Sequence, residues 1–356
     1  MTKHIKYPSI NQYRNVIKSV IDKSHYVGRD EYDNPIFDRT RPLPILTFKG
    51  TPKIHGTNSS VVIWPDRSVT VQSRNRVLSE GSDNAGFYNF VSSQDGILTL
   101  KNLVEDIKIE EPITIYGEWC GEGIMKGVAI SELPKMFIIF DVCYGNDDAR
   151  TWFNISSKIT EQENKKGIYS INQFESYELD IDFRNPQLHQ NELVYITEQV
   201  EAECPVGKFF GVSGIGEGVV WKCITEGYED SKFWFKVKGE KHSVSKVKTL
   251  AEVDVEKLKT IEEFGDRVLT KNRLNQGIEY LKEMGHEMSQ KSTGQFISWV
   301  FNDVTKEESD IIEESGLNKK EIGKVIGDRA RKWYFNYLDN ESAKEALFDI
   351  MTKEDN

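Results

Sequence analysis

A lysine in a short turn is the residue of this sequence best suited to covalent chemistry. Lys53 lies within residues 51–58, directly behind a proline, and forms a K-x-x-G pattern with Gly56 ahead of the strand-like run 60–64. A lysine amine attacks a phosphorus or carbonyl centre once burial or neighbouring cations lower its pKa. Because the pattern is short, an ordinary surface turn is the more frequent explanation for a lysine in it. The residues further along the chain decide between a nucleophile and a surface lysine.

Three apolar segments resemble buried strands that carry an acid, which lies near the far end in the first two and between glycines in the third. The segments are residues 113–119, 136–142 and 214–222, and their acids are Glu118, Asp141 and Glu217. Carboxylates are ligands for magnesium, and Phe140, which precedes Asp141, has a face that can stack on a base. Each residue alone has an ordinary alternative, because Phe140 could belong to the core and Glu118 could be solvated. Together these residues favour a nucleotide site.

A fourth strand, predicted over residues 232–238, adds a pair of cations. Lys236 and Lys238 share one of its faces, because side chains alternate along a strand. The whole chain has a formal net charge of -11, so no general positive field would attract a polyanion. Residues 232–248 are nevertheless rich in lysine. The sequence therefore predicts a local basic groove, in which lysines would hold phosphates.

Composition limits the class of protein. The 356 residues are enough for two domains, and 38% hydrophobic with 29% charged residues is typical of a soluble globular protein. The four cysteines lack C-x-x-C spacing, which argues against a structural zinc site or a disulfide framework. No segment approaches the ~20 apolar residues of a membrane span, and the N-terminus lacks an apolar signal core. We expect a cytoplasmic protein, or one of the host cytoplasm if a phage encodes it, with no membrane contact.

Periodicity predicts the elements around these residues. Ser9 has the character of an N-cap for an amphipathic helix that ends before Gly28, and residues 29–47 are rich in turn formers. We expect the latter to form a long loop. Residues 59–64 and 68–73 form a hairpin in this interpretation.

The C-terminal part has a different pattern. From residue 249 onward the apolar spacing is helical, with cap signals at Thr305 and within residues 318–321. We therefore expect a first domain over residues 1–248 and an all-helical domain over residues 249–356.

Taken in order, the site residues resemble the successive motifs of the covalent nucleotidyltransferases, which comprise ATP-dependent DNA and RNA ligases and mRNA capping guanylyltransferases. The matching segments are residues 53–58, 73–74, 116–118, 137–141, 217–222 and 235–238. More narrowly, the chain resembles the RNA ligase 2 family of phages and trypanosome editing. His55 and Asn58 favour this branch, because DNA ligases and capping enzymes usually have K-x-D-G. Those enzymes also continue into an OB barrel, whereas this tail is helical.

The resemblance implies the fold and the reaction. The fold would be α+β, with a nucleotidyltransferase domain of ATP-grasp-like antiparallel sheets and helices before a small all-helical C-terminal domain. Lys53 would attack the α-phosphate of ATP, expel pyrophosphate and carry AMP as a phosphoramidate. The AMP would pass to an RNA 5′-phosphate, and a 3′-hydroxyl would displace it. The expected enzyme is thus a monomeric ATP-dependent RNA ligase that uses Mg²⁺ or Mn²⁺ and repairs nicks in duplex RNA.

Roles for individual residues follow from the same resemblance. Lys236 and Lys238 would contact the α-phosphate and lower the pKa of Lys53, since a nearby cation disfavours another ammonium. Glu217 would bind metal, and Glu118 would contact the ribose and a metal. The other nucleotide contacts would come from Asn58 beside the phosphate, Arg74 at the ribose and the 5′-phosphate, Phe140 stacked on adenine, and Lys222 near the phosphates. Further candidates are His55 beside the nucleophile, Asp141 beside Phe140, and Lys126 as an RNA phosphate contact.

Three alternatives stay open at this point. A capping guanylyltransferase or a small DNA ligase would need a downstream OB barrel. A non-catalytic RNA-binding protein that keeps the pocket would be expected to lose the nucleophile or the metal acids, yet all are present. A helical docking protein with an unrelated β domain would leave the order of the motifs to coincidence.

Overall fold

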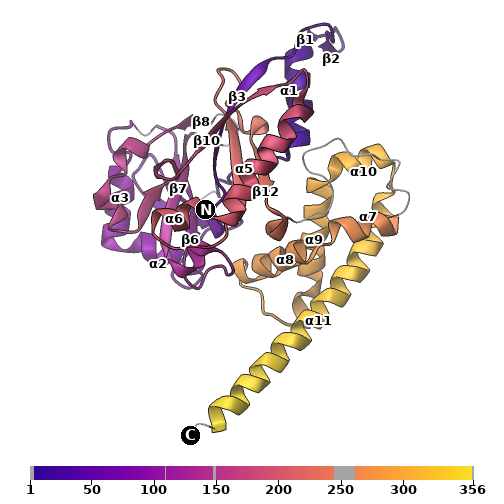
Figure 1. Cartoon of the computed structure of the whole chain (residues 1–356). Helices are drawn as coiled ribbons and strands as arrows, with labels where there is room; N and C mark the ends of the chain where they lie inside the picture. Colours follow the sequence, from indigo (N-terminus) through magenta and orange to yellow (C-terminus); the bar gives the residue numbers. More distant parts are fainter. Residues whose placement is uncertain (1–3, 109, 147–149, 244–260, 355–356) are drawn as a thin grey trace. The chain divides into compact units, whose positions relative to one another are not determined.

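The computed structural model describes residues 4–108, 110–146, 150–243 and 261–354, with side chains to residue 342 in the last helix. The chain divides into two compact units, Met1–Lys241 and His242–Asn356. The first unit combines sheets with helices, and the described part of the second is helical, which confirms the predicted α+β class (Figure 1). The predicted boundary at residue 248 lies outside the described residues.

The larger sheet of the first unit has six strands in the order β5-β4-β6-β7-β8, with β9 paired to β7. Only the β7–β9 pair is parallel among the described pairs of this sheet. The strands are β4 (Thr57–Ile63), β5 (Val69–Ser73), β6 (Ile113–Cys120), β7 (Met136–Tyr144), β8 (Thr151–Phe153) and β9 (Ile168–Ser170). The predicted hairpin and the first two predicted acid-bearing strands are therefore confirmed.

Apolar residues on one face of the larger sheet build its core. Val61 and Phe137 are fully buried there and pack with Phe87 of α2 (Phe87–Ser92), while α3 (Gln94–Asn102) adds further apolar side chains. Each such side chain contributes about 1.5–3 kcal/mol when it is fully buried. This packing fixes the strands that carry the predicted acids and aromatic residue.

The smaller sheet has four antiparallel strands in the order β10-β3-β11-β12. They are β3 (Ile45–Pro52), β10 (Tyr177–Asp182), β11 (Gly218–Cys223) and β12 (Phe235–Lys238). Phe235 and Val237 are buried, and the ring of Phe235 lies 4.9 Å from that of Tyr13 in α1 (Tyr13–His25). Lys236 and Lys238 lie on the opposite face and are partly exposed, as the alternation predicts.

Two predicted strand starts are wrong. The strand predicted from residue 214 begins only at Gly218, and the backbone N–H of Gly216 donates to the carbonyl of Val200 in a helix instead of to a neighbouring strand. The strand predicted from residue 232 begins at Phe235. Residues Ser231–Phe233 form a 3-10 turn (η5), in which the side chain of Asp230 accepts a hydrogen bond from the backbone of Lys232.

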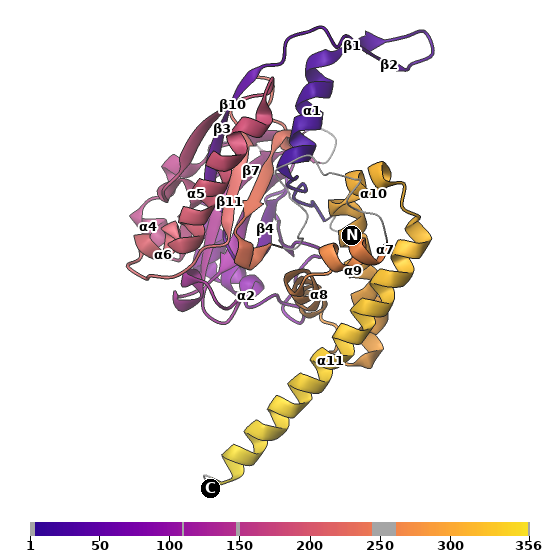
Figure 2. The ribbon, with the colours of Figure 1, turned by 45° about the vertical axis from the view of Figure 1, so that its right-hand side comes forward.

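The N-terminal helix also begins later than predicted. Gln12 occupies the N-cap position of α1 without a side-chain cap bond, so the assignment of Ser9 as N-cap is wrong. The residues before it are extended and bind to both sheets. Part of the predicted long loop is a hairpin of β1 (Tyr26–Arg29) and β2 (Pro35–Phe37), which extends beyond the end of α1 (Figures 1 and 2).

The remaining helices of the first unit lie between β9 and β11 or just before β9. They are α4 (Glu161–Asn164), α5 (Gln190–Ala202) and α6 (Pro205–Phe209). Helix α5 packs against the smaller sheet, where the backbone carbonyl of Val200 accepts a hydrogen bond from Gly216. This contact supports the chain just before β11, where Glu217 lies.

The second unit has its own apolar core. Its helices are α7 (Ile261–Val268), α8 (Lys271–Glu283), α9 (Thr293–Glu307), α10 (Ser309–Ser315) and α11 (Lys319–Glu354). The buried stripe of α11 consists of Ile322, Ile326, Ala330 and Tyr334, which agrees with the helical apolar spacing of this part of the chain. Among the helices that the structure describes, none has both the length and the apolar character to span a membrane.

One cap prediction in this unit is confirmed and one is wrong. The side chain of Asn318 caps α11 by accepting a hydrogen bond of 2.9 Å from the backbone N–H of Lys320. Thr305 lies inside α9, where its hydroxyl donates to the carbonyl of Phe301 instead of capping a new helix. The next helix starts after Glu308, which is fully buried and forms an ion pair with Arg273.

Candidate active site

Lys53 lies where the chain crosses from one sheet to the other. Strand β3 ends at Pro52 and β4 begins at Thr57, and the backbone N–H of Lys53 donates to the carbonyl of Gly218 at 2.8 Å. A Cβ on Gly56 would lie 2.5 Å from the carbonyl oxygen of Trp119, so the turn needs glycine there. The side chain of Lys53 is 22% exposed. It is therefore not an ordinary surface lysine.

Glu217 is the partner of Lys53 and the centre of an ion cluster. Its carboxylate is 4% exposed, and its Oε2 lies 2.9 Å from Nζ of Lys53 and 3.1 Å from Nδ1 of His55. Its Oε1 lies 2.9 Å from Nζ of Lys238. Burial by itself would raise the pKa of Glu217, but Lys238 and Lys53 outweigh it and hold this pKa well below its ordinary value. Glu217 is thus a buried anion between two partly exposed lysines.

The prediction that the lysine pair lowers the pKa of Lys53 is wrong for this arrangement. Burial acts to lower the pKa of Lys53, but the carboxylates of Glu217 and Glu118 outweigh it and raise this pKa. The pKa of Lys238 is instead lowered. Burial and the positive charges of Lys53 and Lys236 lower it, and together they outweigh Glu217, which acts to raise it. The two lysines differ in their other neighbours, because Glu118 adds a second negative charge near Lys53, whereas Lys53 and Lys236 add positive charge near Lys238.

Glu118 brings a second carboxylate to the cluster. It lies on β6, where its neighbour across the pair is Asn58 of β4. Burial raises the pKa of Glu118 to about 7, with Lys53 acting against the rise and Glu217 adding to it. The structure therefore brings Asn58 and Glu118 together, and it couples Glu118 electrostatically to Lys53 and Glu217.

Two arginines follow the hairpin and have different surroundings. The Nη1 of Arg74 donates to the backbone carbonyl of Tyr7 at 3.0 Å, and its charge acts on Lys53 and Glu118. Arg76 instead donates from Nη1 to the carbonyl of Ser82 and from Nη2 to that of Asp83. Arg74 thus belongs to the cluster, while Arg76 holds a neighbouring loop.

Phe140 occupies a β-bulge, which no periodicity indicated. Tyr116 pairs with Asp141 and Gly117 pairs with Ile139, so Phe140 has no partner on β6. A bulge redirects side chains from the regular alternation. At the bulge, Phe140 and Asp141 are consecutive side chains that are both partly exposed, whereas regular alternation would bury one of them.

Lys222 is bound to the acid beside Phe140. Its Nζ lies 2.6 Å from Oδ1 of Asp141, 5.8 Å from the ring centroid of Phe140 and 4.5 Å from that of Trp234. Sequence patterns did not reveal this pair, or the contact of Tyr7 with Asp141, because the partners come from distant segments. Lys126 is exposed on the loop after β6, and among the described residues the structure does not bring it to the Lys53 cluster.

The carboxylates have the chemistry of a divalent-metal site. Within the described ranges, no group of three or more His, Cys, Asp or Glu is placed to hold a metal by itself. Magnesium is commonly bound by one or two carboxylates together with substrate phosphates, and Glu118 with Glu217 supply such a pair. The donor set therefore fits a metal that arrives with a phosphate ligand.

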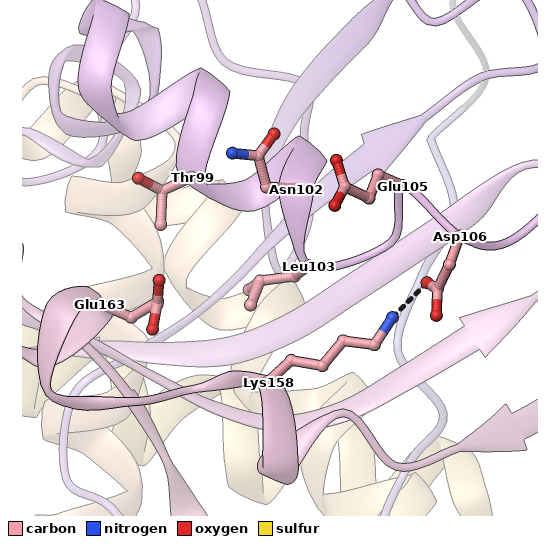
Figure 3. Close-up of a pocket in the computed structure, with 7 residues that line it drawn as sticks. All are labelled: Thr99, Asn102, Leu103, Glu105, Asp106, Lys158 and Glu163. Carbon is pink, nitrogen blue, oxygen red and sulfur yellow. Dashed lines mark hydrogen bonds and ion pairs between the residues drawn. The ribbon is translucent and has the colours of Figure 1, made fainter.

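A hollow of about 350 Å³ elsewhere in the first unit is not this site. It lies beside α3 and α4, and Figure 3 shows Lys158 bound there to Asp106, with Glu105 and Glu163 on the same lining. None of the predicted site residues lines it. Its excess of carboxylates disfavours phosphates, so the nucleotide chemistry belongs to the cluster around Lys53.

The fold and cluster together define an α+β protein in which a lysine between two sheets is bound to a buried carboxylate. A model of the RNA ligase family matches residues 47–238, which is more than half of the chain and includes every predicted site residue. The chain belongs to the RNA ligase family. This confirms the family resemblance drawn from the motifs.

Other comparisons give distant likenesses. A comparison with curated protein sequences finds no match. Structures of RNA ligase from Naegleria gruberi with ATP and manganese and with pyrophosphate are each 18% identical, with TM-scores of 0.42. In each case the aligned part covers 67% of this chain and 57% of the other chain. The family assignment therefore rests on the sequence match.

Proposed function

We propose that this protein is an ATP-dependent RNA ligase that joins a 3′-hydroxyl to a 5′-phosphate through a lysyl-AMP intermediate. The observation that carries the proposal is the buried cluster in which Glu217 binds both Lys53 and Lys238. Membership of the RNA ligase family supports the same conclusion.

The first step requires a neutral Lys53. After its ammonium proton passes to solvent, the amine attacks the α-phosphorus of ATP, a nitrogen–phosphorus bond forms and the bond to the pyrophosphate oxygen breaks. A second proton leaves the nitrogen for solvent to give the phosphoramidate, and pyrophosphate departs. Because Glu217 raises the pKa of Lys53, this carboxylate must bind another cation in place of Lys53 before the amine can lose its proton and react. Mg²⁺ or Mn²⁺ bound through Glu217, Glu118 and phosphate oxygens would neutralise charge on the reacting phosphorus. Lys238 and Lys236 are then available to contact the α-phosphate.

Other residues have roles in holding ATP and the RNA end. Phe140 stacks on the adenine from its bulge, and Asn58 lies beside Glu118 at the phosphate side of the site. Arg74 contacts the ribose and then the RNA 5′-phosphate. His55, which binds Glu217 at 3.1 Å, orients this carboxylate. In the later steps AMP moves to the 5′-phosphate, and the 3′-hydroxyl displaces it to form the phosphodiester.

We further propose that the two units divide the work, with adenylylation in the first and engagement of RNA in the helical second unit. A chain that ends at Lys241, the last residue of the first unit, would then form the AMP adduct but join RNA poorly. Loss of both activities in a folded truncated chain would contradict this division. Lys126 is proposed as an RNA phosphate contact, and the enzyme as a monomer.

The preferred substrate in this proposal is a nick in duplex RNA. The test is a joining assay with one labelled 5′-phosphate strand presented as nicked duplex RNA, as an RNA–DNA hybrid and as a single strand. We expect sealing of the nicked RNA duplex to be fastest, by about tenfold over the single strand, which corresponds to 1.4 kcal/mol. Faster joining of the single strand would contradict the duplex assignment, and no joining of any substrate would contradict ligation.

A further inference from the structure

The extended segment before α1 connects the two sheets. The backbone N–H of Ile5 donates to Oε1 of Gln72 on β5 at 2.9 Å, which is a contact with the larger sheet. The N–H of Asn11 donates to the carbonyl of Trp234 at 3.1 Å, and the N–H of Lys236 donates to the carbonyl of Asn11 at 3.0 Å. These bonds attach the segment to β12 of the smaller sheet. The segment therefore contacts both of the sheets that carry the candidate site residues.

Tyr7 is the residue of this segment whose ring packs among aromatic side chains next to the candidate site. It is 5% exposed, and its ring meets that of Phe140 edge-on with centroids 5.0 Å apart. Its ring also lies 5.0 Å from that of Tyr116 and 6.2 Å from that of Trp234. Such aromatic pairs restrict the positions of the rings they contain. Tyr7 thus supports Phe140 from the side.

The hydroxyl of Tyr7 has a specific partner. It donates a hydrogen bond to Oδ2 of Asp141. Burial raises the pKa of Tyr7 well above its ordinary value, and the charge of Asp141 raises it further, so the hydroxyl keeps its proton and stays a donor. A donor to a carboxylate forms one of the stronger hydrogen bonds in proteins.

Asp141 links Tyr7 to Lys222, because its carboxylate binds both residues. While Oδ2 accepts from Tyr7, Oδ1 lies 2.6 Å from Nζ of Lys222. The ammonium is also held over the ring of Trp234 at 4.5 Å, a favourable cation–π position. Without the hydroxyl, the carboxylate of Asp141 would lose one of the bonds that fix its orientation.

We propose that Tyr7 is a positioning residue of the nucleotide site, which orients Asp141 so that Lys222 stays fixed beside Phe140. This inference rests on the proposed function, in which Phe140 stacks on adenine and Lys222 contacts ATP. Tyr7 itself does not touch the reacting atoms. Its effect is therefore on the binding of ATP and not on the attack by Lys53.

The test compares Tyr7→Phe with a matched Tyr13→Phe control in the full-length protein. Tyr13 is also fully buried, but its hydroxyl donates to the backbone carbonyl of Pro186 at 2.8 Å, away from the Lys222 pair. The rate of self-adenylylation is measured against ATP concentration. We expect Tyr7→Phe to raise KM for ATP about tenfold with kcat changed less than about threefold, and Tyr13→Phe to leave both unchanged.

A second variant tests the route through Lys222. In a Lys222→Ala background, adding Tyr7→Phe should raise KM no further, because the two residues act through one contact. A further increase of about tenfold would overturn the route through Lys222 and leave Tyr7 with a packing role. If Tyr7→Phe does not fold, Asp141→Asn must raise KM for ATP in its place, since it keeps the side-chain shape and removes the charge.

The outcomes separate this inference from the proposed function. Adduct formation in the unaltered protein with an unchanged KM in Tyr7→Phe would overturn the positioning role alone. Absence of any AMP adduct in the unaltered protein would overturn the proposed function and this inference with it. Equal changes in Tyr7→Phe and Tyr13→Phe would assign the effect to general loss of a buried hydrogen bond.

Discussion

Lys53 and Glu217 lie 164 residues apart in the sequence and form an ion pair of 2.9 Å. The carboxylate is 4% exposed and binds Lys238 through its other oxygen. A buried anion with two lysine partners is a costly arrangement unless all its members are present, because removal of one leaves an uncompensated charge. The pair is therefore both a part of the fold and the resting state of the proposed nucleophile.

Replacement of Glu217 by glutamine should harm both chemistry and stability. The amide keeps the shape but cannot neutralise two ammonium groups or bind a divalent metal well. We expect the rate of adenylylation to fall by about 100-fold or more and the free energy of unfolding by about 3 kcal/mol. Adduct formation followed by mass spectrometry and thermal unfolding measure the two effects. Glu178→Gln, at an exposed position on β10, should change neither; a Glu217→Gln protein with normal rates would refute the role of this carboxylate.

Gly218 controls the register that brings Lys238 to Glu217. A Cβ at Gly218 would lie 2.2 Å from the carbonyl oxygen of Val237, and its φ angle of 149° disfavours other residues. Gly218→Ala should therefore displace β12 at the point where Gly218 pairs with Lys238. We expect a loss of about 2–4 kcal/mol in unfolding free energy and slower adenylylation.

The matched control for this substitution is Gly81→Ala. A Cβ at Gly81 would have nothing within 4 Å, so its stability and labelling rate should stay close to those of the unaltered protein. Chemical denaturation compares the two variants directly. Equal stability of Gly218→Ala and Gly81→Ala would mean that the register around Lys238 tolerates a side chain.

The helical unit depends on a buried arginine. Arg273 is fully buried and binds Asp303 at 2.8 Å and Glu308 at 3.1 Å. Arg273→Met removes the cation that offsets the charge of the fully buried Glu308, which should destabilise this unit by about 3–5 kcal/mol. Arg331→Met is the control, because Arg331 is 53% exposed and forms a surface pair with Asp328.

Calorimetry is the measurement for this pair of variants. Arg331→Met should change the unfolding free energy by less than about 0.5 kcal/mol. Adenylylation by Arg273→Met should persist at a temperature where the first unit stays folded, since the Lys53 cluster lies within residues 1–241. A stable Arg273→Met protein would show that the buried ion pairs contribute little to this unit.

Local patterns in the sequence predicted much of the site, and long-range contacts explain what they missed. Alternation placed Lys236 and Lys238 on one face, and apolar runs located the strand of Glu118. The extra residue of a bulge leaves no trace in such patterns, so the arrangement of Phe140 beside Asp141 could not be predicted. The Thr305 cap prediction failed because α9 continues through Thr305 to Glu307, and α10 starts after Glu308, whose partner Arg273 is 35 residues away in the sequence.

The same limit applies to charge. A sequence shows which lysines are near one another but not which acid lies between them. The pKa of Lys53 was predicted to be lowered by the lysine pair, whereas Glu217 and Glu118 raise it. Tyr7 was missed because the short segment before α1 gives no sign, in its own sequence, of the two sheets that it contacts.

The most direct test is to find which residue carries AMP and whether its attachment needs a divalent metal and Lys53. The purified protein, first treated with pyrophosphate and magnesium to remove any bound AMP, is incubated with ATP and magnesium and its intact mass is measured. We predict one AMP adduct that maps to the peptide containing Lys53, that is absent with a chelator, and that is absent in Lys53→Ala. Lys49→Ala, which alters a lysine of the same segment bound to Asn172 at 2.7 Å, should still form it. An adduct that persists in Lys53→Ala, or that maps to another residue, would contradict the assignment of Lys53 as the nucleophile.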